Sequence, residues 1–155
     1  MQYQFLLWVH ILSSTLLFGT GLGTAFHGWM AHCSGDVRAI AVASRNVVIA
    51  DWLFTTPAVI IQPLTGGLLA WQAGIPFTTG WLALAIGSYF LTGACWLPVV
   101  WLQMRMHHLA AAAVRNSSEL PLLYFRYARW WFILGWPAFL AVIAVFYLMV
   151  FKPAI

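Results

Sequence analysis

The stretch from Trp8 to Cys33 most constrains the fold, because it is apolar, uncharged and as long as a lipid bilayer is thick. About 20 apolar residues, each rising about 1.5 Å in a helix, cross the hydrocarbon core of a membrane. Three further apolar stretches of similar length follow it in the chain. We therefore predict an all-α fold, an integral membrane four-helix bundle that forms a single transmembrane domain over residues 1–155.

The distribution of basic residues predicts the orientation of this bundle. The predicted spans cover about residues 4–31, 47–71, 81–103 and 130–151. The connections 32–46 and 104–129 hold six of the seven Lys and Arg residues, whereas the turn between the second and third spans holds none. By the positive-inside rule, we expect both charged connections to be cytoplasmic loops and both termini to be periplasmic. An alanine run is expected to extend the third helix out of the membrane as far as Asn116.

The composition excludes several classes of protein. With 63% hydrophobic and only 6% charged residues, the chain is not an ordinary soluble domain. No basic patch interleaved with exposed aromatic residues is evident, so nucleic acid is not an expected partner. The N-terminus lacks the basic segment of a cleavable signal peptide. We expect a multi-pass protein of a bacterial inner (plasma) membrane, with the lipid bilayer as its main partner.

One line of small and polar residues runs along the first span. At about 100° per residue, these positions fall within about 40° of one line on a helical wheel: His10, Ser14, Leu17, Gly21, Thr24, Gly28 and His32. Such a line is predicted to face other helices or a cofactor rather than lipid, with Gly21 at its centre. An ionisable side chain inside a membrane span is a functional candidate by default. His10 is therefore the strongest candidate in the chain.

The second span carries two polar side chains and two prolines. Asp51 has three open interpretations: a carboxylate at a helix N-terminus, a partner for Arg45, or a proton carrier for a quinone site near the inner surface. Gln62 is expected to form a hydrogen bond across helices. Pro57 and Pro63 bend the helix, either to make a compact bundle or to open space for a flat cofactor.

Short motifs in the first three spans resemble known membrane proteins. The runs Thr56–Ile61 and Gly66–Leu69 are similar to the Pro-Ala … Gly-Leu-x-Leu helix of HemJ-type protoporphyrinogen oxidases. A closer resemblance is to the DUF2269 family of bacterial integral membrane proteins, in the wider CopD/HemJ-like set. It covers residues 1–105 and includes His10, Gly19–Gly23, Asp51–Phe54 before Pro57, Gln62–Gly66 and Trp96–Gln103.

This resemblance implies a cofactor. HemJ-like proteins bind haem b through the histidine of the first span, which implies His10 as the iron ligand here. The third span of those enzymes also carries a lysine and a histidine inside the membrane, whereas Trp81–Val100 has neither. The resemblance thus implies haem binding but not protoporphyrinogen oxidase activity, and an oxidoreductase activity of another kind stays open.

The number of haems is also open. Only weak candidates for a second ligand lie at the depth of His10, namely Met149, Tyr147 and the helix end at Gln62, so a five-coordinate iron is an open alternative. A second, inner haem would use His27 and His107, with propionates held by Arg105, Arg126 and Arg129. The alternative is that these side chains are solvated or bind lipid phosphate. His32 lies about 33 Å along the helix from His10, so the two histidines cannot hold one haem.

Three functions fit these features: electron transfer, carriage of a metal or haem, and a purely structural role. The first is a cytochrome b-like protein that transfers electrons, with a quinone as a candidate partner. The second is a carrier of copper or haem, although Met30, Met104 and Met106 at the inner end do not form the ligand series that copper transport requires. The third is a structural subunit of a larger membrane complex. A second copy of the chain or a redox protein is an open partner in each case.

Overall fold

The structure is a computed structural model, which describes residues 1–154 as five α-helices and one π-helical turn. The elements are α1 (Gln2–Ser34), α2 (Val37–Ala50), η1 (Asp51–Thr55), α3 (Thr56–Gln72), α4 (Gly80–Arg115) and α5 (Leu122–Phe151). Because α2, η1 and α3 follow one another without a break, these residues contain four helices long and apolar enough to cross a membrane. This confirms the predicted all-α, four-span architecture.

The charged connections are more helical than the sequence suggested. Residues 37–46, expected in a loop, belong to α2, which begins where the Asp36 side chain accepts a hydrogen bond from the Arg38 backbone N–H at 2.8 Å. The preceding Gly35 adopts φ 69° and ends α1 in a left-handed cap. The alanine run extends α4 to Arg115, as predicted. Each connection is therefore a tight hairpin rather than a long loop.

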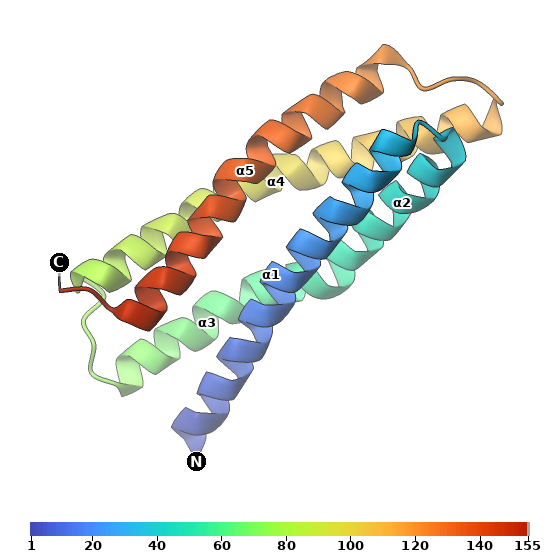
Figure 1. Ribbon diagram of the computed structural model, residues 1–155. Helices are drawn as coiled ribbons and strands as arrows, with labels where there is room; N and C mark the ends of the chain where they lie inside the picture. The colour runs from blue at the N-terminus through green and yellow to red at the C-terminus, as the bar shows by residue number, and fades with distance from the viewer. Residues whose placement is uncertain (155) are drawn as a thin grey trace.

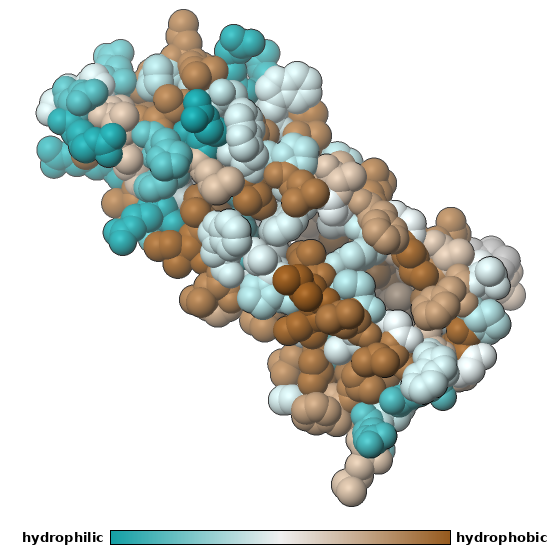
Figure 2. All heavy atoms as spheres, turned by 180° about the vertical axis from the view of Figure 1, so that it is seen from behind, coloured by the Kyte–Doolittle hydropathy of each residue, from teal (hydrophilic) through white to brown (hydrophobic). Residues whose placement is uncertain are grey.

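The four long helices place the chain termini at one end of the bundle and the charged hairpins at the other (Figure 1). We call the end with the α1–α2 and α4–α5 hairpins the charged end, and the other the terminal end. Figure 2 shows hydrophilic residues gathered mainly at the charged end, with hydrophobic residues over most of the remaining length. This distribution is that of a bundle whose sides face lipid.

Packing is tight at the charged end and looser toward the terminal end. In Figure 1, α5 lies along α4, while α1 lies along α2 and α3. A core of Ile40, Met106, Ala110 and Tyr124 joins α2, α4 and α5 at the charged end. Farther along, Phe18 of α1 stacks on Phe139 of α5, with ring centroids 5.5 Å apart. Figure 2 shows the surface hollowed between the helices beyond the charged end.

Each proline of the second span changes the backbone hydrogen bonds around it. Pro63 has no N–H, so the Val59 carbonyl four residues before it loses its helical donor. The Tyr89 hydroxyl of α4 donates a hydrogen bond to this carbonyl. Ahead of Pro57, the Thr56 N–H bonds to the Asp51 carbonyl five residues back, which defines the π-helical turn. These contacts favour a role of the prolines in shaping the bundle.

Candidate functional site

His10 lies at the centre of a polar network between α1 and α3. Its Nδ1 is 2.8 Å from Thr65 Oγ1, and its Nε2 is 3.1 Å from Gln62 Nε2. The Ser13 hydroxyl, one turn along α1, donates to Gln62 Oε1. Both Ser13 and Thr65 are buried, and His10 is half-buried. The expectation that Gln62 bonds across helices is therefore confirmed, with His10 and Ser13 as its partners.

The hydrogen bonds of this network fit a His10 tautomer with its proton on Nδ1. The Thr65 hydroxyl donates within its own helix to the Ile61 carbonyl at 2.8 Å, so toward His10 it can only accept. His10 Nδ1 therefore carries the proton, and Nε2 carries a lone pair. The Gln62 amide donates to that lone pair. The network thus holds a neutral imidazole whose Nε2 is the accepting nitrogen.

A glycine provides room for the imidazole ring. A Cβ built on Gly66 would lie 3.1 Å from His10 Cε1 and 3.7 Å from His10 Nδ1. The distance to Cε1 is shorter than an ordinary van der Waals contact. The adjacent Gly67 has no atom within 4 Å of such a Cβ. His10 therefore packs directly against the backbone of α3 at Gly66, where a side chain would displace it.

The remaining part of the predicted line on α1 does not form one continuous contact. Ser13, rather than the predicted Ser14, is the buried serine. Gly21 is exposed, and a Cβ there would meet no atom within 4 Å, so no helix packs against it. Gly28 and His32, at the far end of the line, contribute to a cavity at the charged end. The line therefore reaches two separate sites, with an open helix face between them.

The residues predicted for a second, inner haem are His27, His107 and Arg105. His27 is exposed on α1. His107 is half-buried and lies 5.7 Å from the His108 ring between centroids, and the Arg105 guanidinium lies 5.9 Å from the centroid of the Trp101 ring. Within residues 1–154 no three His, Cys, Asp or Glu side chains form a group that could hold a metal ion.

Asp51 takes a position that the sequence did not suggest. It lies inside a continuous helical rod rather than at a helix N-terminus, and only 4% of its surface is exposed. The Thr55 hydroxyl donates to Oδ1 at 2.9 Å, and the Gln103 side chain of α4 lies nearby. Within residues 1–154, Oδ2 has no hydrogen-bond partner, so Asp51 is not paired with Arg45, one of the three interpretations left open by the sequence. The π-helical turn begins at Asp51 and directs the carboxyl of this residue toward α4.

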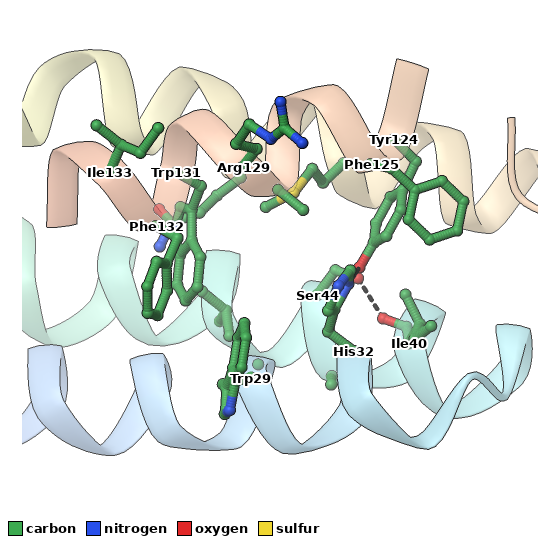
Figure 3. A pocket seen from close by; sticks show the side chains of 16 residues that line it. Trp29, His32, Ile40, Ser44, Tyr124, Phe125, Arg129, Trp131, Phe132 and Ile133 are labelled. Atoms are coloured by element: carbon green, nitrogen blue, oxygen red, sulfur yellow. Dashed lines mark hydrogen bonds between the residues drawn. The ribbon is translucent and has the colours of Figure 1, made fainter. Parts of the chain in front are cut away.

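A cavity at the charged end was not predicted. It has a volume of about 380 Å³ and is lined by residues of α1, α2, α4 and α5, among them His32, Gln103, Tyr124 and Arg129. Figure 3 shows His32 and Trp29 of α1 facing Tyr124, Phe125 and Phe132 of α5 across it. The polar lining residues belong to four different helices, so the sequence alone did not show that they meet at one cavity.

Together, fold and site define a four-span integral membrane protein whose first and second spans are joined by a histidine-centred polar network. A family model described as "Predicted integral membrane protein (DUF2269)" matches residues 4–153, and the chain belongs to this family. The match includes the fourth span, beyond the residues that carried the resemblance. No curated protein and no solved structure matches the chain.

Proposed function

We propose that this protein binds haem b through His10 and transfers electrons within the membrane, with a quinone as redox partner. The observation that carries the proposal is the hydrogen bond from His10 Nδ1 to Thr65 Oγ1 at 2.8 Å. Histidines that ligate metals commonly donate their other ring N–H to an oxygen, which fixes the tautomer and orients the ring. Thr65 has this positioning role, and His10 Nε2 would be the iron ligand.

The residues around His10 fit one axial ligand of a haem. The donor is a neutral imidazole nitrogen with a lone pair, the form that iron binds. Gln62, which donates to Nε2 at 3.1 Å, is a neutral amide that would turn away when iron binds. Haem held by His10 would supply one-electron chemistry at this site.

Three broader assignments accompany this proposal. We place the chain in the wider CopD/HemJ-like set, on the basis of the shared histidine and the Pro-Ala … Gly-Leu motif. We locate it in a bacterial inner membrane with both termini periplasmic, because six of seven Lys and Arg residues lie toward the charged end. In this orientation His10 lies in the outer half of the membrane and the cavity in the inner half.

The test is the visible spectrum of the purified protein, reduced minus oxidised, after expression with a supply of haem. We expect a Soret band and reduced α and β bands in the wild type. His10→Ala should lose most of this absorbance while still inserting into the membrane, because alanine is compatible with a membrane helix. His27→Ala is the matched control, since it removes an exposed histidine of the same helix.

A second pair of variants tests the positioning role of Thr65. Thr65→Val removes the oxygen that accepts from His10 and should broaden or shift the bands and weaken haem retention. Thr24→Val is its control, because the Thr24 hydroxyl bonds only to backbone carbonyls of its own helix. A wild-type protein that stays colourless with excess haem would contradict the proposal, as would equal spectra of wild type and His10→Ala.

A further inference from the structure

Asp51 and Gln103 are neighbouring buried side chains, and each has one oxygen atom without a hydrogen-bond donor. Asp51 of η1 is 4% exposed, and Gln103 of α4, which lies beside it, is 7% exposed. Within residues 1–154, Asp51 Oδ2 and Gln103 Oε1 are buried and have no hydrogen-bond partner. Such atoms are rare in folded proteins, because each has lost its bonds to water without a replacement. The pair therefore lacks a donor.

The surroundings of Asp51 do not stabilise a carboxylate ion. The elements that pack against η1, together with α4, carry these charged or histidine side chains: His10, His27 and His32 on α1, Arg38 and Arg45 on α2, none on α3, and Arg105, His107, His108 and Arg115 on α4. Within residues 1–154 none of them bonds to Asp51 Oδ2, and His107 lies near Arg45 and His108 instead. A buried carboxylate without a cation costs far more free energy than a neutral carboxylic acid.

A proton on Asp51 completes the hydrogen bonds of both side chains. A carboxylate can only accept hydrogen bonds, whereas a neutral carboxylic acid has one O–H donor. With the proton on Oδ2, the acid donates to Gln103 Oε1, and Oδ1 still accepts from the Thr55 hydroxyl at 2.9 Å. One hydrogen atom thus gives a partner to both oxygens that lack one.

We infer that Asp51 and Gln103 form a proton-binding site within the second and third spans, with the proton on Asp51 Oδ2 and Gln103 Oε1 as its acceptor. Uptake of H⁺ forms the Oδ2–H bond and neutralises the carboxylate, and release reverses this step without any change of oxidation state. Gln103 also lines the cavity at the charged end, whereas Asp51 does not, so we expect the proton to exchange with solvent on the side of Gln103. The site is separate from His10 and does not depend on haem.

The test is infrared difference spectroscopy of the purified full-length protein in dodecyl maltoside micelles, which contribute no carboxyl or ester band. The chain has only two aspartates, Asp36 and Asp51, so ¹³C at the aspartate carboxyl carbon identifies the signal in the unmodified protein. We expect the C=O stretching band of a protonated carboxylic acid at neutral pH. The band should disappear at alkaline pH and return when the pH is lowered again.

Three variants assign this band. Asp51→Asn should lose it and still fold, because the Asn amide N–H donates to Gln103 Oε1 in place of the acid O–H. Asp36→Asn is the matched control, since it makes the same chemical change at an exposed aspartate and should keep the band. Gln103→Leu should shift the band to higher wavenumber, because the acid O–H loses its acceptor. If a variant does not fold, the ¹³C-labelled wild type still decides whether the acid is protonated.

The outcomes separate this inference from the haem proposal, because none of them depends on haem absorbance. Absence of the band from the wild type at neutral pH, or an unchanged band in Asp51→Asn, would overturn the inference. An unchanged band in folded Gln103→Leu would overturn the pairing with Gln103. A band that persists at alkaline pH would also overturn it, because the carboxyl would then be permanently neutral rather than a site of proton uptake and release.

Discussion

Substitution of Gly66 by alanine tests the contact between α1 and α3 at single-atom resolution. The new Cβ would lie 3.1 Å from His10 Cε1, so the ring must give by a few tenths of an ångström. That shift loosens the bonds of His10 to Thr65 at 2.8 Å and to Gln62 at 3.1 Å. Hydrogen bonds between membrane helices contribute about 0.6 kcal/mol each on average, with a maximum near 1.7 kcal/mol. Loss of most of two such bonds should cost about 1 kcal/mol.

Gly67→Ala is the internal control for this measurement. Both substitutions exchange glycine for alanine in the same turn of α3, so they share the gain in helix propensity. A Cβ at Gly67 meets no atom within 4 Å, whereas the three atoms nearest to a Cβ at Gly66 all belong to His10. The difference between the two variants in free energy of unfolding, measured by reversible denaturation in mixed micelles, should be about 1 kcal/mol, with Gly66→Ala the less stable. Equal stability would refute the packing of His10 against Gly66.

Two further predictions concern the bundle as a whole. Tyr89→Phe leaves the Val59 carbonyl without a donor and should destabilise the protein by about 1 kcal/mol in the same denaturation assay. Tyr147→Phe changes an exposed ring of α5 and should have little effect on stability. A larger loss of stability in Tyr147→Phe than in Tyr89→Phe would refute the role of Tyr89. A reporter active only in the periplasm should be active when inserted near Pro76 or fused after residue 155, and inactive near Ser117; the opposite pattern would overturn the proposed orientation.

The sequence predicted the spans and the principal histidine because both depend on local chemistry. Apolar length alone identifies a membrane helix, and a histidine or glutamine inside one must find a polar partner, as His10 and Gln62 do. The identity of the buried serine was not predictable, since a regular helical wheel selects Ser14 and the actual crossing of α1 and α3 buries Ser13.

The cavity and the position of Asp51 depend on how whole helices cross. The long helices are apolar on every side, so hydrophobic periodicity does not reveal which face is inside. Gln103 and His32 line the same cavity because four helices converge at the charged end. The π-helical turn at Asp51 depends on how the backbone accommodates Pro57, which the sequence leaves open between several distortions.

Chemical rescue of His10→Gly tests the proposed iron ligand most directly. This variant removes the imidazole beside Gly66 and Thr65 and leaves space in which free imidazole can bind. The account predicts that the purified variant shows little haem absorbance alone, and that millimolar imidazole with added haem restores a Soret band like that of the wild type. Haem absorbance in His10→Gly equal to the wild type without imidazole would contradict ligation by His10.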